Sequence, residues 1–420
     1  MSLARAGPAT YQVGERCAHF TGNYSRDGEM TGVSSLTQGP SSLAEAESLK
    51  ARLVLQPNDP PGWFRLAQLL RVLGDAAGAL AAVTRALAGG PGQLDSLLLA
   101  AALHEDLGDL PTAAAAYRTA LSQVRQGMAI LQQQRADLEH GKAVIARSDE
   151  ALESQLETRL SKIRAAFPDE PLGRFDRCMA TVLRKRRVYR PMPSFLYFPN
   201  IPSVEFFERE DFAWLPQIEA ATEDIRTELL GVLASAPEEV RPYITTRETP
   251  GVTVQKPAGD GPWRQLEESP RWSSFFLWQE GLPYADNIAR CPKTAAAIAA
   301  RPFCDLPRTA PTVMFSILQP KTRIPPHTGV TNARLVVHLP LIVPPGCGFR
   351  VGAETRQWEL GKALIFDDSI EHEAWNDSDQ MRAVLIFDIW NPFLTRAERE
   401  MVKTLSAGIG DYYGTLPPYV

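Results

Sequence analysis

The sequence predicts a multidomain α plus β protein in which helical repeats come first and an antiparallel β domain follows. Its 420 residues are too many for one compact core. An Ala- and Leu-rich part of the chain resembles itself when shifted by 34 residues, which is typical of stacked helical hairpins. Beyond Pro168, short β-branched or aromatic runs are separated by Gly, Pro, Asn and Asp, which predicts an antiparallel sandwich or closed roll.

The composition is that of an ordinary globular protein and disfavours several classes of partner. Hydrophobic residues make up 44% and charged residues 22%, and a net charge of −5 offers no basic field to nucleic acid or an anionic membrane. The five cysteines contain no CxxC pair, which argues against a zinc ribbon or a disulfide framework. No apolar run approaches the ~18 residues of a spanning helix, and no secretory h-region is evident. We therefore expect a cytoplasmic protein with no membrane span that binds a small ligand or another protein.

Two helical units are expected at about 60–91 and 94–125, within a repeat region covering residues 43–125. Gly74-Asp75 returns as Gly108-Asp109. Apolar residues return where two antiparallel helices must approach closely, with Ala79, Val83 and Ala86 followed by Ala113, Tyr117 and Ala120. The pattern resembles the tetratricopeptide repeat. Such repeats present a concave surface that can bind a peptide, and a rigid spacer is the alternative interpretation.

The segments on either side of the repeats have different textures. Residues 1–42 mix Gly, Ser, Thr and Pro without a sustained period and are expected to be a disordered tail. Residues 126–168 carry apolar side chains at helical spacing among Gln, Arg, Glu and Lys, which predicts one long connecting helix that ends at Pro168. Because each hairpin leaves an apolar face that a neighbour must cover, this helix is a candidate cap for the repeats.

Residues 169–420 are expected to form the β domain with flanking helices. Within a strand, alternation places Val336 and His338 on one face and Val337 and Leu339 on the other. Strands are predicted at 313–318, 334–343, 348–351, 357–360, 363–366, 371–375 and 382–389.

Three of the six histidines, His327, His338 and His372, fall in this β-patterned stretch, and the other three are scattered through the tail and helices. Imidazole is a common ligand of iron, copper and zinc, and an arginine suits the carboxylate of a bound ligand. We expect His327 on a stiffened turn after Pro325-Pro326, and His372 at the start of a later strand. Two such histidines followed by a strand arginine, here Arg382, have the spacing of an iron site in a double-stranded β-helix.

At these residues the sequence resembles the aspartyl/asparaginyl β-hydroxylase family of Fe(II)- and 2-oxoglutarate-dependent oxygenases. The resemblance covers roughly residues 190–395. It is most specific in the following segments: Phe315-Ser316-Ile317, His327-Thr328-Gly329, Thr331-Asn332, Arg334 to His338, Phe366 to Ser369, Glu371-His372-Glu373 with Trp375, Arg382, and Trp390-Asn391-Pro392. Several animal members of the family also carry tetratricopeptide repeats before the catalytic domain, so the predicted domain order agrees. The resemblance implies a double-stranded β-helix of the jelly-roll, cupin-like type.

The resemblance also implies a role for individual residues. His327 and His372 would bind Fe(II), and Arg382 with Ser316 would hold the distal carboxylate of 2-oxoglutarate. His338 would contact the carboxylate nearer the metal. With O₂ as co-reactant, the products would be succinate, CO₂ and a hydroxylated C–H. The expected target is the β-carbon of an Asp or Asn side chain in a peptide or protein, recruited by the repeats, with a small-molecule substrate left open.

Two positions depart from related patterns. Many family members have an arginine where this chain has Val336, so the carboxylate of 2-oxoglutarate nearer the metal would have one cationic partner fewer. Arg334, on the same strand face, is the nearest candidate to replace that partner, although its position looks more like one that binds substrate. Most related oxygenases have a ligating carboxylate two residues after the first histidine, where this chain and its family have Gly329. Asp368 is expected to act instead by hydrogen bonding a metal-bound water.

Two other classes of function remain open. One is a repeat-containing interaction protein whose β domain senses 2-oxoglutarate or has lost turnover. The other is a cupin-like isomerase or hydrolase that uses zinc or manganese, in which His338 would be a third metal ligand.

Overall fold

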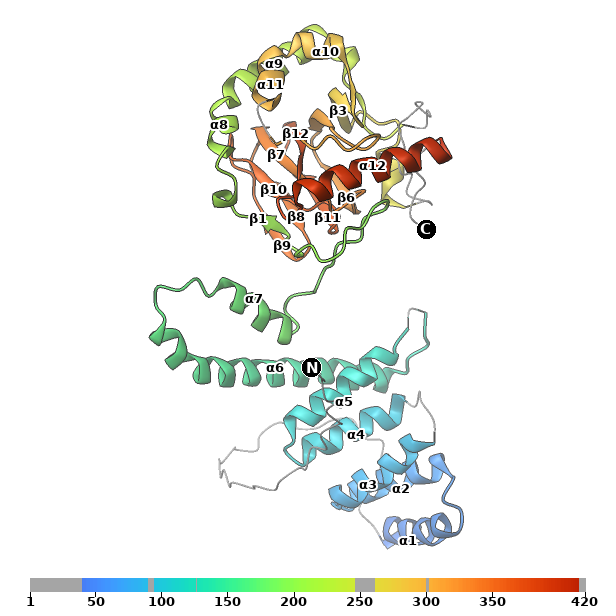
Figure 1. Ribbon diagram of the computed structural model, residues 1–420. Coiled ribbons are helices and arrows are strands. Elements are labelled where there is room, and N and C mark those ends of the chain that lie inside the picture. The colour runs from blue at the N-terminus through green and yellow to red at the C-terminus, as the bar shows by residue number, and fades with distance from the viewer. Residues whose placement is uncertain (1–39, 90–93, 126, 246–260, 300–301, 415–420) are drawn as a thin grey trace, which may run out of the picture. The chain divides into compact units, whose positions relative to one another are not determined.

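The computed structural model describes residues 40–89, 94–125, 127–245, 261–299 and 302–414 (Figure 1). The chain divides into two compact units, Met1–Glu170 and Pro171–Val420. Among the described residues, the first unit is helical and the second holds every strand. A helical region followed by an antiparallel β region is the order that the sequence predicts. The predicted tail lies outside the described residues, except that its last three residues begin the first helix.

The helical unit is built from two hairpins with a helix on either side. Its helices are α1 (Pro40–Leu55), α2 (Pro60–Val72), α3 (Ala76–Ala88), α4 (Leu94–Asp106), α5 (Leu110–Gln123) and α6 (Gln132–Ala166). The predicted units at 60–91 and 94–125 correspond to the pairs α2–α3 and α4–α5, each of which packs together.

The repeated Gly-Asp pair makes the turn inside each hairpin. Gly74 and Gly108 adopt φ values of +82° and +77°, a left-handed conformation that favours glycine at the end of a helix. The next residue starts the following helix, because the carboxylates of Asp75 and Asp109 accept hydrogen bonds from Gly78 N and Thr112 N at 2.8 and 3.2 Å. The sequence repeat therefore encodes one helix stop and one helix start per unit.

The first part of α6 covers the second hairpin. Leu138, Gly141 and Val144 are the buried residues of this 35-residue helix, and Leu138 and Val144 share a core cluster with Tyr117 of α5. Further along, Leu152 and Ile163 are 42% and 57% exposed. About two turns of α6 thus close the apolar face of the repeats, while the later part of the helix stays largely exposed.

The β unit contains two antiparallel sheets. In the larger, the strands run in the order β1-β10-β7-β12-β5-β3-β2 with β4 beside β3, and in the smaller the order is β6-β11-β8-β9. The strands are β1 (Phe206–Phe207), β2 (Arg241–Pro242), β3 (Trp272–Gln279), β4 (Leu282–Pro283), β5 (Val313–Leu318), β6 (Thr322–His327), β7 (Arg334–Ile342), β8 (Cys347–Val351), β9 (Glu354–Arg356), β10 (Leu364–Phe366), β11 (His372–Asn376) and β12 (Arg382–Trp390).

The two faces of the larger sheet belong to different cores. Leu335, Val337 and Leu339 of β7 pack in a cluster with helix residues such as Ile225 and Leu229. Val336 belongs instead to a cluster with Phe349 and other residues of the smaller sheet. The predicted alternation along β7 is confirmed. It directs one face of the sheet toward helices and the other toward the second sheet.

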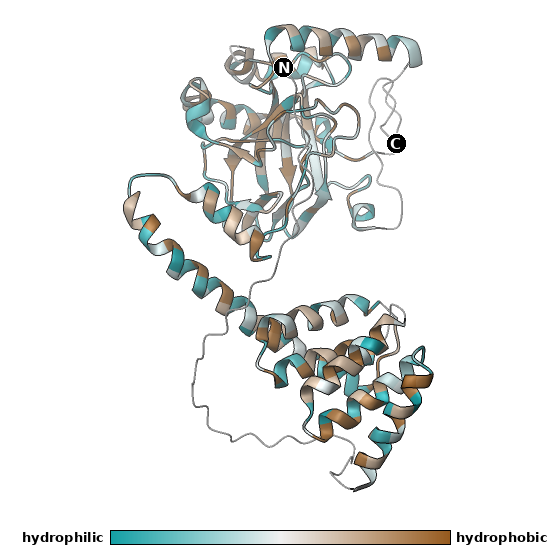
Figure 2. Cartoon of the chain, turned by 60° about the horizontal axis from the view of Figure 1, so that its bottom comes forward, coloured by the Kyte–Doolittle hydropathy of each residue, from teal (hydrophilic) through white to brown (hydrophobic). Residues whose placement is uncertain are grey.

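Helices α8 (Leu215–Ala220), α9 (Thr222–Ser235) and α11 (Pro292–Ala299) cover the outer face of the larger sheet (Figure 1). The other described helices of the β unit are α7 (Gly173–Val182), α10 (Ala285–Arg290) and α12 (Arg396–Tyr413), with short 3₁₀ turns at Arg209–Asp211, Pro237–Glu239 and Pro262–Gln265. Hydrophobic residues gather in the strands (Figure 2). Among the described residues, no helix has the length and apolarity to cross a membrane.

One strand prediction was wrong, and two longer strands were missed. The run at 357–360 holds only an isolated bridge between Glu359 and Lys362, and the strand comes earlier, as β9. The edge strand β6 was not predicted, because Pro325 and Pro326 favoured a turn. Strand β3 was also missed, since its apolar residues show no clean alternation and most are buried.

The contact between α5 and α6 leads to a stability prediction. A Cβ added to Gly141 would lie 2.5 Å from Cδ1 of Tyr117, whereas one on the helical Gly231 would meet nothing within 4 Å. Alanine in place of glycine inside a helix normally stabilises by roughly 0.5–1 kcal/mol. We expect Gly231→Ala to raise the free energy of unfolding by this amount. Gly141→Ala should lower it by about 1–3 kcal/mol, because the Tyr117 ring must move.

Urea unfolding of the full chain, followed by far-ultraviolet circular dichroism, measures both variants. A gain in stability for Gly141→Ala that equals the gain for Gly231→Ala would contradict the packing of α6 on α5.

Candidate functional site

His327 and His372 lie opposite one another on β6 and β11. Their ring centroids are 4.0 Å apart. Each Nδ1 lies within hydrogen-bond distance of a carbonyl two residues earlier, Pro325 O at 2.8 Å and Ile370 O at 3.0 Å. Since a carbonyl can only accept, each Nδ1 carries the proton and each Nε2 keeps a lone pair.

Both rings are uncharged at neutral pH. Burial, together with the neighbouring His372, lowers the pKa of His327 to about 3. Burial also lowers the pKa of His372 to about 4. The neutral ring is the form that binds a metal, so this pair is ready to act as two nitrogen ligands.

The prediction that His327 lies on a turn was wrong, because it is the last residue of β6. Proline cannot donate to a neighbouring strand, so it is tolerated mainly at the edge of a sheet. In the smaller sheet β6 is such an edge strand, and this position accommodates Pro325 and Pro326. The strand therefore holds the ring of His327 more firmly than a turn would.

Arg382 is a buried cation without an anionic partner. It is 1% exposed, and its Nε and Nη1 atoms have no hydrogen-bond partner. Its guanidinium carbon lies 4.5 Å from the centre of the Trp358 ring, and no carboxylate of the described residues pairs with it. Burial lowers the pKa of Arg382 to about 10, which still leaves it charged at neutral pH. Because an uncompensated buried charge costs several kcal/mol, an anion from beyond the described residues would stabilise this site.

Ser316 and His338 lie on strands that flank β12. Ser316 opposes Val384 and Leu318 opposes Arg382, so the side chains of Ser316 and Arg382 are diagonal neighbours on one face. The Ser316 hydroxyl accepts a hydrogen bond from Trp272 Nε1 at 3.1 Å and keeps its own proton to donate. His338 opposes Ile386, and its buried Nδ1 has no partner.

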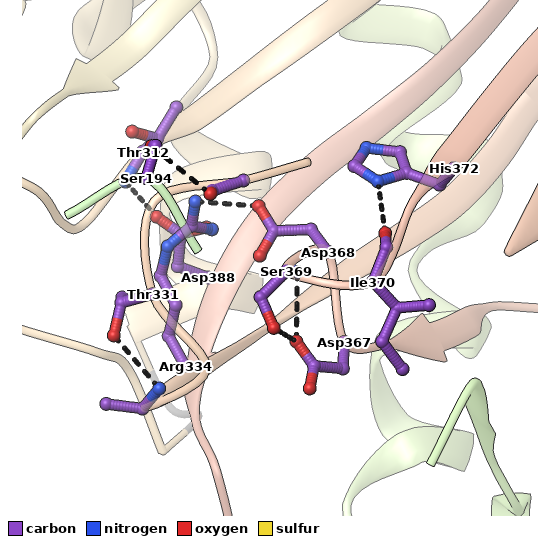
Figure 3. Close-up of polar contacts among 12 residues, drawn as sticks. Ser194, Thr312, Thr331, Arg334, Asp367, Asp368, Ser369, Ile370, His372 and Asp388 are labelled. Carbon is purple, nitrogen blue, oxygen red and sulfur yellow. Dashed lines mark hydrogen bonds and ion pairs between the residues drawn. The ribbon is translucent and has the colours of Figure 1, made fainter. Parts of the chain in front are cut away.

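The predicted substrate residue Arg334 is held between two buried aspartates (Figure 3). Its Nη2 donates to Asp368 Oδ2 at 2.9 Å and its Nη1 donates to Asp388 Oδ1. Thr312 N donates to the other oxygen of Asp388 at 2.8 Å. Burial opposes the charged form of Arg334, yet Asp368 and Asp388 hold its pKa above the usual value. The charge of Arg334 is therefore satisfied within the chain.

Burial raises the pKa values of both aspartates, and Arg334 opposes that rise. The value for Asp388 is about 6, and Asp368 shifts in the same direction. One oxygen of Asp368, Oδ1, is buried without a partner. Asp367, next in the chain, accepts hydrogen bonds from Ser369 N and Oγ at 2.9 and 2.6 Å (Figure 3). Of Asp367 and Asp368, only Asp368 lines the cavity that the site residues share.

The Asp368 carboxylate occupies the space that a side chain at position 329 would fill, so glycine fits there. A Cβ added there would lie 2.0 Å from Asp368 Oδ2, and Gly329 N donates to Asp368 O at 2.6 Å. A ligating carboxylate at position 329 would therefore displace Asp368. In the part of the chain that the structure describes, no group of three or more His, Cys, Asp or Glu side chains is arranged to hold a metal.

All the predicted site residues line one cavity of about 510 Å³. They are Ser316, His327, Arg334, His338, Asp368, His372 and Arg382. The cavity also contains Asp388, which the sequence analysis missed although it lies on the same face of β12 as Arg382. The two neutral imidazoles suit a divalent metal, and the unpaired cation of Arg382 suits an anionic ligand bound beside it.

Comparison with known proteins identifies relatives of the β unit. Residues 219–392 match the family described as aspartyl/asparaginyl beta-hydroxylase. Over 141 residues the chain is 42% identical to the aspartyl/asparaginyl beta-hydroxylase of Mus musculus, covering 33% of this chain and 19% of the mouse protein. Over 205 residues it is 34% identical to the ornithine lipid ester-linked acyl 2-hydroxylase of Rhizobium tropici, covering 48% of this chain and 66% of that protein.

Among solved structures, the chain matches the Sgt2 TPR domain from Aspergillus fumigatus at 18% identity, covering 28% of this chain and 88% of that one, with a TM-score of 0.21. The chain thus aligns with less than two thirds of each of these sequence relatives. The segment matched by the family nevertheless contains every side chain of the candidate site. Over residues 219–392 of its C-terminal unit, the chain is therefore similar to the family described as aspartyl/asparaginyl beta-hydroxylase.

Proposed function

We propose that this protein is an Fe(II)- and 2-oxoglutarate-dependent oxygenase that hydroxylates an unactivated C–H bond and releases succinate and CO₂. The two facing sheets would form the double-stranded β-helix of such enzymes. The observation that carries the proposal is the burial of the unpaired Arg382 in the same cavity as the His327–His372 pair. A metal site alone would not require that cation. A dicarboxylate that also reaches the metal accounts for both features.

Each site residue has a distinct part in the proposal. His327 and His372 would bind the metal through Nε2, since Nδ1 of each is fixed by a backbone carbonyl. Arg382 pairs with the distal carboxylate of 2-oxoglutarate, and the Ser316 hydroxyl donates a second hydrogen bond to it. His338 donates from Nδ1 to the carboxylate nearer the metal. Bound iron, 2-oxoglutarate and O₂ together supply the oxidising power that breaks the C–H bond.

Asp368 would act on a bound metal through water. Its free Oδ1 could accept a hydrogen bond from a water on the metal, and Arg334 with Gly329 fixes the position of its carboxylate. Arg334 is thus a positioning residue as well as an ion-pair partner. The residues around the site exclude bulk water, which strengthens each of these interactions.

The proposal specifies the reaction rather than the substrate class. The mouse relative's name states an Asp or Asn target, whereas the Rhizobium relative's name states an acyl chain. The prediction that the helical repeats recruit a partner is kept as part of the proposal. A sensor without turnover would bind Fe(II) and 2-oxoglutarate yet form no succinate. A cupin-like isomerase would use His338 as a third metal ligand.

Substitution of the site residues tests the proposal. We expect His327→Ala and His372→Ala each to lower the affinity for Mn(II), used in place of iron, by more than about 100-fold. Arg382→Met should retain metal binding and weaken 2-oxoglutarate binding by about 100-fold or more, because two charge-assisted hydrogen bonds are lost. It should also stabilise the ligand-free protein by about 1–4 kcal/mol, since it removes a buried charge.

Equilibrium dialysis measures metal binding, anaerobic calorimetry measures 2-oxoglutarate binding, and succinate formation reports turnover. His140→Ala, on the exposed face of α6, is the matched control and should change none of them. An unchanged affinity for 2-oxoglutarate in Arg382→Met would remove the main support for the proposal.

A second prediction tests the position of Asp368. Gly329→Ala places a methyl group where the Asp368 carboxylate now lies, so we expect Mn(II) affinity to fall by roughly 10-fold. Gly408→Ala, whose Cβ would meet nothing within 4 Å, is the control. Electron paramagnetic resonance of free Mn(II) gives both affinities. Equal affinities in the two variants would show that Asp368 has no effect on the metal.

A further inference from the structure

Among the residues that the structure describes, the charged side chains that line the cavity leave no cation for a substrate carboxylate. Three arginines line it, and so do three carboxylates, those of Glu280, Asp368 and Asp388. Arg334 is paired with Asp368 and Asp388, while Arg308 donates to Gly414 O and Asp411 at 3.0 and 3.2 Å. Arg382 is the remaining arginine of the described lining, and the proposed function assigns it to 2-oxoglutarate. An acidic side chain entering this cavity would meet Asp368 and Asp388 rather than an unpaired cation.

Val336 adds no charge to this part of the cavity. It lies on β7 between Arg334 and His338, opposes Asp388 of β12, and is 6% exposed. A charged side chain here would face the cavity next to the cosubstrate residues. With valine, the floor of the cavity is apolar at this point. A substrate carboxylate bound here would lie next to the carboxylate of Asp388, and Val336 would supply no positive charge to offset their repulsion.

A continuous row of side chains crosses the floor of the cavity. Phe276 of β3 opposes Met314 of β5, Met314 opposes Ile386 of β12, and Ile386 opposes His338 of β7. All four line the cavity. With neighbouring strands about 4.8 Å apart, the row extends for roughly 14 Å, which is longer than any single apolar side chain. It begins at the residue proposed to touch the cosubstrate and continues over three apolar side chains.

An aromatic wall adjoins the far end of this row. The rings of Tyr243 and Trp272 stack with centroids 4.1 Å apart, and Tyr243 also stacks on Phe276 at 6.2 Å. Phe276, Met314 and Ile386 carry no hydrogen-bonding side-chain atoms. A peptide laid along them would lose hydration of its amide groups without gaining partners, whereas a methylene chain has no such groups.

We propose that the substrate enters as an extended saturated acyl chain, lies along the strip formed by Phe276, Met314 and Ile386, passes beside Val336, and presents a methylene to the metal. This inference rests on the proposed function. Val336 is the specificity-determining residue, because it keeps the floor apolar where an arginine would select a carboxylate. The chain can belong to a membrane lipid or to a soluble amide or ester, which share this chemistry.

Binding to the protein loaded with Mn(II) and 2-oxoglutarate, without O₂, tests the inference. The probes are decanoyl amide in solution, phosphatidylcholine vesicles, and three peptides that differ only in a central Asp, Asn or Leu. Quenching of tryptophan fluorescence reports binding, since Trp263 and Trp272 line the cavity. We expect the decanoyl amide to bind at least about tenfold more tightly than any of the peptides. Equal or tighter binding of any peptide would overturn the inference.

Variants on and beside the strip provide the second measurement. Val336→Arg should weaken decanoyl amide binding at least about tenfold and strengthen binding of the Asp peptide, whereas Val336→Leu should keep the preference of the wild type. Met314→Glu, on the strip itself, should weaken the decanoyl amide as well. If both charged variants bind it as the wild type does, the strip is not the binding surface. Tight binding of the vesicles supports a lipid as the source of the chain, and binding of the amide alone supports a soluble source.

Failure of this inference can be distinguished from failure of the proposed function. If the wild type binds neither Mn(II) nor 2-oxoglutarate, the proposed function is wrong. If it binds both and not the decanoyl amide, only the substrate class is wrong. Retained binding of Mn(II) and 2-oxoglutarate by Val336→Arg shows that this variant is folded.

Discussion

The unpaired charge of Arg382 is the constraint on which the β unit depends. A guanidinium that is 1% exposed and has two nitrogen atoms without partners destabilises the protein unless an anion binds beside it. Other arginines in the same core are treated differently, since Arg334 has two carboxylates of its own. The two arginines therefore differ: Arg334 forms ion pairs within the fold, whereas Arg382 has no such pair among the described residues.

The two sheets divide the site between them. The larger sheet supplies Arg382, Ser316 and His338, and the smaller supplies His327 and His372. Because side chains alternate along a strand, the larger sheet can pack against helices with Val337 and its neighbours while turning its other face to the cavity. The proposed metal ligands and the proposed anion site thus come from opposite walls, so a ligand that touches both must lie between the sheets.

Much of this arrangement could be predicted from the sequence, since it depends on local patterns. The Gly-Asp pairs mark the helical turns, and the alternation along β7 separates Val336 from Val337. What could not be predicted depends on pairing between distant strands. Arg334 meets Asp388 only because β7 and β12 are adjacent, and no local signal indicates that its charge is already satisfied. Likewise, the edge position of β6, which allows prolines in a strand, is a property of the assembled sheet.

The proposed function depends on one ligand that is held by Arg382 and by a metal bound to His327 and His372. The most direct test is calorimetric titration of 2-oxoglutarate into the protein with and without Mn(II), in the absence of O₂. If one molecule bridges both parts of the site, Mn(II) should raise the affinity for 2-oxoglutarate by at least about tenfold, and 2-oxoglutarate should raise the affinity for Mn(II) by the same factor. Equal affinities with and without the metal would mean that the two parts bind independently, which would contradict the account.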